Sequence, residues 1–477
     1  MGSRLKHHLN CHLKLHLKRW TVGVCTLLLV ACSSVPELDQ QIRDIPVPQQ
    51  WKKGTEVLSV QHHWLAQLAD EQGQLTELVD KALASNHQLR QLAFNVDIKK
   101  QQLIASGSAL WPSLDLTLSE SRRKNGATAN IANSYSSSVD LQYELDVWGK
   151  LSANERQANL NFMAEQASFQ QAKQQLVANV VTQWFAVIEA RKQLDLYLQR
   201  VTNSKQNLEI IDTGYKQGIN NALDVYLTRN ELNNELARTA QQKDTLVKAT
   251  RQLERLLGDY PKGSLEVNAD LPLLQNEIPL GLPSELISRK PALVGNWYQL
   301  LAKDAQLAYA HKQRFPSLKL RSSIGKDGAN LADMFSAQLG WSLLGSLTAP
   351  LFDAGRLKAQ ETQALLSLKQ GEQQYLDSLY SAFSEVENAV SSESTLKERY
   401  QLMVKAQQNA QAAKTLSFEQ YRNGLVSYTT VLDAQNRAFD AQSTVIQIKN
   451  QLIVNRIKLH IALGGDFAEP TSLEKVK

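Results

Sequence analysis

Two stretches of the chain alternate between apolar and polar residues, a pattern typical of β-strands with one apolar and one polar face. In the first stretch, residues 134–147, the odd positions are apolar except for Ser137: Tyr135, Val139, Leu141, Tyr143, Leu145 and Val147. In the second, residues 334–351, alternate positions are again apolar: Phe335, Ala337, Leu339, Trp341, Leu343 and Leu347. Residues 113–121 and 317–324 repeat the pattern over shorter lengths and predict the partner strands.

The length of these stretches distinguishes a membrane-crossing strand from a strand of a soluble protein. A membrane-crossing strand needs about 9 to 11 residues, whereas strands in soluble proteins usually have about 5 to 6. The pattern therefore predicts strands that cross a bilayer. The polar segments 122–133 and 325–333 are the predicted outer loops.

Apolar residues at three- and four-residue steps predict very long helices. Residues 149–214 contain no proline, and a helix of that length extends about 100 Å at 1.5 Å per residue. The remaining predicted helices are residues 355–421, the shorter 223–257 and 428–463, and the opening helices 75–108 and 284–312.

The chain is a tandem repeat with a period of about 206 residues. Four segments return in the same order: Trp111-Pro112-Ser113-Leu114 as Phe315-Pro316-Ser317-Leu318, Gly149-Lys150-Leu151 as Gly355-Arg356-Leu357, Tyr215-Lys216-Gln217-Gly218 as Tyr421-Arg422-Asn423-Gly424, and Leu256-Leu257-Gly258 as Ala462-Leu463-Gly464. We therefore expect repeat 1 at residues 74–258, a proline-rich linker at 259–283, repeat 2 at 284–465 and a tail at 466–477.

The N-terminus has the pattern of a bacterial lipoprotein signal. Five basic residues precede a short apolar run, which ends in Leu29-Val30-Ala31-Cys32. The apolar run, Thr21 to Ala31, is shorter than the roughly 20 residues of a transmembrane helix; a short membrane anchor is the alternative interpretation. The pattern predicts a signal peptide at residues 1–31, a lipid on Cys32 and a lipid-anchored tether at residues 32–73.

Removing that signal changes the charge of the chain. The formal charge of +5 comes from 52 basic and 47 acidic residues. Residues 1–31 hold five basic and no acidic residues, so 52 minus 5 leaves 47 basic against 47 acidic residues. A neutral mature chain argues against nucleic-acid binding. Of the three cysteines only Cys32 remains, which excludes an internal disulfide.

No catalytic motif is found in the sequence. His62 and His63 are adjacent, so they share neither a helix face nor a strand face. The chain has no Gly-rich phosphate loop and no paired-cysteine motif. We therefore expect no enzyme, no metal and no cofactor besides the covalent lipid.

Four strands are too few to close a barrel. An open sheet in hydrocarbon leaves edge N–H and C=O groups without partners, at several kcal/mol each. Copies of the chain must therefore share one wall: two copies give a filled eight-stranded barrel, and three give twelve strands with a lumen. The polar face with Asp140, Gln142 and Glu144 suits a water-filled interior. This argument asks for three or more copies and leaves four open.

The chain resembles the TolC-like outer membrane factors of tripartite efflux pumps, in their lipid-anchored branch. The segments that carry the resemblance follow in order along the chain: Ile45-Pro46-Val47-Pro48, Trp148-Gly149-Lys150, Gly281-Leu282-Pro283-Ser284-Glu285-Leu286, Phe352-Asp353-Ala354-Gly355-Arg356, Glu385-Val386-Glu387-Asn388-Ala389 and Tyr421-Arg422-Asn423-Gly424-Leu425-Val426-Ser427-Tyr428. The resemblance implies a mixed α+β membrane fold: a homotrimeric twelve-stranded outer-membrane β-barrel continued by a long α-helical periplasmic barrel.

The resemblance also implies a function, a location and partners. The chain would be the exit duct through which a periplasmic adaptor and an inner-membrane transporter of the RND type expel drugs or other toxic compounds. It would sit in the Gram-negative outer membrane and contact its lipid. A type I secretion duct and a non-conducting lipid-anchored coiled-coil scaffold remain alternatives, and the sequence does not name the substrate.

A gate at the periplasmic helix tips is implied by the same resemblance. It assigns Asp433 and Asp224 to the gate, with Tyr421 as a hydrogen-bond partner across the helix pair. A solvated helix face is the alternative for Asp433, and a helix cap is the alternative for Asp224. Thr430 and Val426 depart from the acidic and basic residues that some relatives carry, which predicts fewer ionic contacts in this gate.

Four glycines and a tryptophan mark the ends of the long helices. Gly218 and Gly424 are the predicted tip turns and the expected contact with the adaptor. Gly149 and Gly355 lie where strand changes to helix, so unusual backbone angles are expected there. Trp148 at the first junction is either part of an aromatic belt or a packing residue.

Overall fold

The structure is a computed structural model of the chain, and the residues that it describes are 47–52, 68, 73–124, 131–274 and 280–465. The predicted signal peptide and Cys32 lie outside these ranges. The chain divides into a sheet unit, Leu114–Ala153 with Gln306–Leu365, and a helical unit, Pro46–Ser113 with Asn154–Ala305 and Leu366–Lys477.

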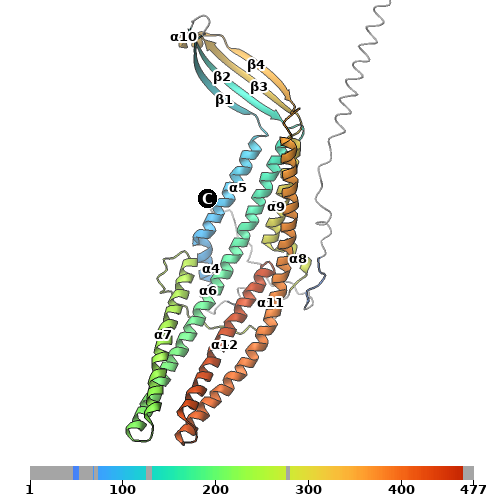
Figure 1. Cartoon of the computed structure of the whole chain (residues 1–477). Coiled ribbons are helices and arrows are strands. Elements are labelled where there is room, and N and C mark those ends of the chain that lie inside the picture. The colour runs from blue at the N-terminus through green and yellow to red at the C-terminus, as the bar shows by residue number, and fades with distance from the viewer. Residues whose placement is uncertain (1–46, 53–67, 69–72, 125–130, 275–279, 466–477) are drawn as a thin grey trace, which may run out of the picture. The chain divides into compact units, whose positions relative to one another are not determined.

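The sheet unit contains one four-stranded sheet in the order β1-β2-β3-β4 (Figure 1). Its strands are β1 (Ser113–Lys124), β2 (Ile131–Leu145), β3 (Ser317–Gly328) and β4 (Gly340–Thr348). β2 of repeat 1 pairs antiparallel with β3 of repeat 2, so the two repeats build one sheet. β1 and β4 are its edges.

The register of β2 against β3 places like residues opposite each other at most positions, with Leu141↔Ser322 as an exception, as expected for a sheet with one apolar and one polar face. Between β2 and β3 the apolar pairs are Val139↔Ile324, Tyr143↔Leu320 and Leu145↔Leu318, and the polar pairs are Asp140↔Ser323, Gln142↔Arg321 and Glu144↔Lys319. The side chains of Leu116 in β1 and Trp341 in β4 are exposed. The predicted period of two is therefore present in the fold.

The predicted strand at residues 334–351 is wrong at its start. Residues Leu331–Ser336 form the short helix α10, and β4 begins only at Gly340. The Asn330 side chain caps α10 by accepting a hydrogen bond from the Asp333 N–H at 2.8 Å, so a helix cap overrides the alternation. The loops predicted at 122–133 and 325–333 are also too long, because β1, β2 and β3 extend into them.

The long helices have equal lengths in the two repeats. α6 (Lys150–Lys216) and α11 (Arg356–Arg422) have 67 residues each, and α7 (Ala222–Leu256) and α12 (Tyr428–Ala462) have 35 each. This equality is the structural counterpart of the sequence repeat.

An aspartate caps each of the two longest helices. Asp146 accepts hydrogen bonds from the N–H groups of Leu151 and Ser152, both at 2.8 Å. Asp353 accepts one from the N–H of Leu357 at 2.9 Å. These carboxylates satisfy amide groups that have no partner within a helix, and they favour the positive end of the helix dipole.

Each predicted opening helix is in fact two helices. Residues 75–108 divide into α4 (Gln74–Ser85) and α5 (His87–Ser108), because Asn86 is extended and its side chain caps α5. Residues 284–312 divide into α8 (Pro283–Arg289) and α9 (Pro291–Lys312). Lys290 is extended because a residue that precedes proline is disfavoured in the α conformation.

The main core of the helical unit lies around the middle of α6. Val180, Val181 and Trp184 pack with Leu253 of α7 and Ile453 of α12 in one buried cluster. Val267 and Leu271 of the predicted linker belong to the same cluster. The linker therefore contributes to the core instead of running over the surface.

The described part of the N-terminal tether is fixed to this unit. Trp51 is 4% exposed, donates from Nε1 to the Gly281 carbonyl at 3.0 Å, and packs edge-on against Phe383. The Lys52 N–H donates to the Glu387 carboxylate at 2.9 Å. Among the described helices, none is both long and apolar enough to cross a bilayer.

His460 near the end of α12 is expected to make the helical unit acid-sensitive. It is 9% exposed, and burial, followed by the charge of Arg456, lowers its pKa to about 4 from 6.5. Its neutral form therefore contributes stability above pH 6.5 that is lost as the pH falls toward 4. The loss amounts to roughly 3 kcal/mol at 1.36 kcal/mol per pKa unit.

Thermal unfolding in detergent across this pH range measures the effect. The variant His460→Gln should show a smaller drop in the unfolding midpoint than the parent chain. Equal pH dependence in both proteins would contradict the prediction.

Candidate functional site at the helix tips

Both long helices end in the same turn, and both turns lie at one end of the helical unit (Figure 1). At the end of α6, the N–H of Gly218 donates to the Tyr215 carbonyl at 2.9 Å and the N–H of Ile219 to the Gly214 carbonyl at 2.8 Å. This pair of bonds is a Schellman motif, which needs a left-handed residue at its centre. Gly218 has φ 75° and supplies it.

The turn after α11 repeats this geometry. Gly424 has φ 72°, its N–H donates to Tyr421 and that of Leu425 donates to Gln420, both at 2.9 Å. A Cβ at Gly218 or Gly424 would meet no described atom within 4 Å. Backbone conformation, not crowding, is therefore the reason for glycine at both turns.

The beginnings of the two return helices differ. Asn221 caps α7 by accepting a hydrogen bond from the Asp224 N–H at 3.0 Å. Asp224 therefore lies in the first turn of the helix, where its charge suits the helix dipole, and is not itself the cap. Ser427 precedes α12 and makes no side-chain cap.

A small apolar cluster joins the two turns. Its buried members are Ile211 of α6, Val225 of α7, and Tyr428 and Val431 of α12. Tyr421 packs against it, with its ring centroid 5.3 Å from that of Tyr428. We refer to this set as the tip cluster.

A hydrogen bond between Tyr421 and Asn220 crosses between the repeats at the tip cluster. The Tyr421 hydroxyl donates to Asn220 Oδ1 at 3.0 Å, and Asn220 Nδ2 donates to the Ile211 carbonyl at 3.1 Å. Burial, followed by the negative charge of Asp224, raises the pKa of Tyr421 to about 12. The phenol therefore stays protonated and remains a donor at physiological pH.

The three predicted gate residues do not meet at one point of the structure. Tyr421 and Asp224 line a common groove, whereas Asp433 is 64% exposed and pairs with Arg437 one turn further along α12, at 2.9 Å. An i,i+4 pair on an exposed helix face is typical of solvated helices. The geometry thus gives Asp433 no partner from another described element.

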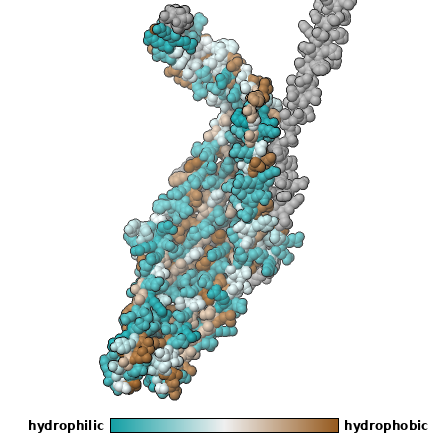
Figure 2. Space-filling model, viewed as in Figure 1, coloured by the Kyte–Doolittle hydropathy of each residue, from teal (hydrophilic) through white to brown (hydrophobic). Residues whose placement is uncertain are grey.

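The groove between the two turns measures about 880 Å³. Gly218, Asn220 and Asp224 line it from the first turn, and Tyr421, Gly424 and Val426 line it from the second. Figure 2 shows hydrophobic side chains at the surface of this end of the helices. Exposed large hydrophobic residues in and next to the two turns are Ile219, Leu223, Tyr226 and Leu425, of which Ile219 lines the groove.

At the strand–helix junctions, Gly149 and Gly355 take the positive φ that the change of period predicted, 70° and 86°. Trp148 stacks on Phe315 with ring centroids 5.5 Å apart, and its Nε1 donates to the Pro316 carbonyl at 2.7 Å. These contacts favour the packing interpretation of Trp148 over the aromatic-belt interpretation.

Two partners at the tip were not identified from the sequence. Arg437 could have been found, because it stands four residues after Asp433. Asn220 could not, because its bond to Tyr421 joins residues 201 positions apart. In the described ranges, no group of His, Cys, Asp and Glu side chains could hold a metal ion.

Comparison with known proteins identifies the family. The family model described as "Outer membrane efflux protein" matches residues 78–259 and, a second time, residues 282–465. The two matches confirm the internal duplication.

Similar proteins span nearly the whole chain. The cation efflux system protein CusC of Escherichia coli K12 is 27% identical over 459 residues, covering 92% of this chain and 97% of its own. The probable efflux pump outer membrane protein TtgC of Pseudomonas putida is 27% identical over 472 residues, covering 94% and 96%. The probable outer membrane lipoprotein SilC of Salmonella typhimurium is 26% identical over 467 residues, covering 95% and 99%.

Solved structures have the same fold. A membrane protein from Pseudomonas aeruginosa superposes with a TM-score of 0.82 at 25% identity, covering 91% of this chain and all of that one. The CmeC outer membrane channel of Campylobacter jejuni has a TM-score of 0.81 at 22% identity, covering 92% and 95%. The duplicated sequence, the four-stranded sheet and the paired long helices agree with these relatives; the chain belongs to the outer membrane efflux protein family, and it is a TolC-like efflux channel of the outer membrane, not an enzyme.

Proposed function

We propose that three copies of this chain form a closed twelve-stranded barrel and act as the passive outer duct of a tripartite efflux pump. A periplasmic adaptor and an inner-membrane transporter of the RND type deliver the compound, and the duct conducts it out of the cell. The tip cluster and the side chains around it close the duct when no partner is bound. A lipid on Cys32 holds each copy to the outer membrane.

The open sheet is the observation that carries this proposal. β1 and β4 are edge strands, and the apolar residues of the sheet are exposed in a single copy. Hydrocarbon does not tolerate unpaired strand edges, so a neighbouring copy is the natural partner for each edge. Three copies leave room for a lumen, which two do not.

The names of similar proteins do not agree on one class of substrate. Their names refer to cations for CusC, antibiotics for ArpC and toluene for one TtgC. A duct that conducts what its pump delivers fits this variety. We therefore assign selectivity to the partners and a broad range of toxic compounds to this chain.

Two measurements test the proposal together. The purified lipidated chain should run as a heat-resistant trimer and show discrete single-channel conductance in planar bilayers. Deleting the gene should sensitise cells to a panel of metals, solvents and antibiotics. A monomeric chain without conductance would overturn the proposal.

Loss of the tip contacts should make the closed duct leak. The double variant Asp433→Ala and Tyr421→Phe removes the carboxylate of Asp433, which pairs within α12, and the bond from Tyr421 to Asn220, which crosses between the repeats. One hydrogen bond contributes about 1 kcal/mol, so the open fraction should rise about fivefold. The readouts are the resting conductance and the sensitivity of cells to large antibiotics that the outer membrane normally excludes.

Asp244→Ala is the matched control for this gate variant, since Asp244 makes a similar i,i+4 pair with Lys248 on α7, more than five turns from the tip. It should leave conductance and sensitivity unchanged. Unaltered permeability in an assembled gate variant would refute the gate.

We expect that a large side chain at position 424 prevents the adaptor from binding in the groove at the tips. Gly424→Trp places a large ring at an exposed turn where no described atom lies near the Cβ position, so trimers should form despite the strained φ of 72°. Efflux should be lost because the groove is filled. Gly424→Asn is the control, since asparagine tolerates left-handed geometry, and it should retain efflux; full efflux by the Trp variant would contradict the adaptor contact.

A further inference from the structure

A polar seam joins α6 of repeat 1 to α12 of repeat 2 between the main core and the tip cluster. Gln193 Nε2 donates to the Ser443 carbonyl at 3.0 Å, and the Ser443 hydroxyl donates back to Gln193 Oε1 at 2.9 Å. Arg200 stands seven residues further along α6 and also contacts α12. Asn207 stands seven residues further still, and its Nδ2 donates to Gln435 Oε1 of α12 at 3.0 Å. This spacing keeps the three α6 residues on one helix face.

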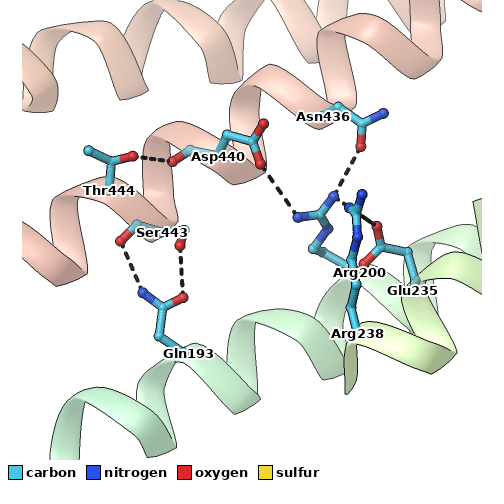
Figure 3. Close-up of polar contacts among 8 residues, drawn as sticks. All are labelled: Gln193, Arg200, Glu235, Arg238, Asn436, Asp440, Ser443 and Thr444. Atoms are coloured by element: carbon cyan, nitrogen blue, oxygen red, sulfur yellow. Dashed lines mark hydrogen bonds and ion pairs between the residues drawn. The ribbon is translucent and has the colours of Figure 1, made fainter. Parts of the chain in front are cut away.

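Arg200 is the centre of this seam and binds two helices at once (Figure 3). Its guanidinium lies 2.8 Å from the Glu235 carboxylate of α7, and the side chains are 3% and 1% exposed. Its Nη2 also donates to Asn436 Oδ1 of α12 at 3.0 Å, and its Nη1 lies 3.7 Å from Asp440. The same Nη2 group therefore contacts both α7 and α12, while Nη1 faces Asp440.

A second helix of repeat 2 is joined to the same point through an aromatic ring. The Arg200 guanidinium carbon lies 4.8 Å from the ring centroid of Phe439 in α12, and Lys414 Nζ of α11 lies 4.7 Å from it. Cation–π attraction operates at this range. Arg200 thus connects the α6–α7 hairpin with both helices of the α11–α12 hairpin.

Hairpin formation does not explain the Arg200–Glu235 pair. At the period of 206 residues, Arg200 and Glu235 correspond to Ala406 and Ala441 of repeat 2. The α11–α12 hairpin nevertheless has helices of the same lengths. A hairpin of this design therefore forms without the ion pair.

Stability does not explain the pair either. Arg200 Nε and Glu235 Oε2 are buried and make no hydrogen bond within the described part of the chain. A buried ion pair with unsatisfied atoms gains little over an apolar pair of the same size. The remaining distinctive property of the pair is its geometry, because one Nη2 group must meet Glu235 and Asn436 at the same time.

We propose that Arg200 is a positioning residue that sets the register of α12 against the α6–α7 hairpin and thereby aligns the tip. Asn436 stands eight residues after Tyr428, and Arg200 stands eleven residues before Ile211. Both segments run as continuous helix into the tip cluster, so a shift at Arg200 is carried to the tip. The inference rests on the proposed gate only for its effect on conductance.

Two variants test the inference. Arg200→Met with Glu235→Leu replaces the pair by apolar residues of similar size, and Asn436→Leu removes only the hydrogen bond to α12. The second variant keeps the ion pair between Arg200 and Glu235. It therefore tests the positioning role even if the first variant does not assemble. Arg229→Met is the matched control, since Arg229 joins α7 to Asp212 of α6 at 3.1 Å within one hairpin.

The readout is the distance between the two tip turns. Spin labels are attached through Gln217→Cys and Asn423→Cys, both at exposed positions, in trimers assembled with an excess of unlabelled chain so that one protomer is measured. The parent and Arg229→Met should give one narrow distance distribution. Both test variants should give a broader one, with the mean shifted by roughly 1–5 Å, the range of helix shifts and one-turn slips.

The outcomes separate this inference from the gate. A narrow, unshifted distribution in assembled test variants would overturn the positioning role, whatever the gate does. A broadened distribution with raised resting conductance supports both proposals. A broadened distribution with unchanged conductance supports the positioning of α12 and contradicts closure of the duct at the tip.

Discussion

The two free edges of the four-stranded sheet are the constraint from which the rest of this molecule follows. The outward-facing backbone groups of β1 and β4 have no strand to pair with in one copy, because the sheet order ends with these strands. In hydrocarbon such edges cost several kcal/mol per unsatisfied group. The proposed trimer meets this need by pairing each edge with the next copy. Assembly is then a condition of membrane insertion, not a later addition to a finished fold.

The two repeats share the residues that set their backbone geometry and differ in the residues that join one repeat to the other. The Schellman turns at Gly218 and Gly424 and the equal helix lengths occur in both halves. The contacts between halves are asymmetric: Tyr421 bonds Asn220, and Arg200 has no arginine counterpart in repeat 2. The two turns at the tip therefore share one backbone geometry but present different side chains.

Local patterns made most of the fold predictable, and non-local pairs limited the rest. Alternation, helical period and the 206-residue repeat predicted the strands, the long helices and the turns, since each depends on nearby residues. The break at Lys290 was predictable from Pro291 but was missed, and the Asn330 cap was hidden by the apparent alternation around Phe335. No periodicity reveals the Tyr421–Asn220 bond, because its partners lie in different repeats.

Along α6 the contacts between the repeats are apolar, then polar, then apolar again. The main core buries 21 residues, of which Ile453 and Ile457 come from repeat 2, and the tip cluster buries four, of which Tyr428 and Val431 come from repeat 2. An opening force applied at the tips reaches the tip cluster first, because this cluster lies at the tip ends of α6 and α12 and the main core lies around the middle of α6. The polar seam around Arg200 lies between the main core and the tip cluster. Its hydrogen bonds are directional, so they resist sliding of α12 along α6 more than they resist separation of the two helices. A duct built this way can open at its end while α12 keeps its register above, so that closing restores the same contacts.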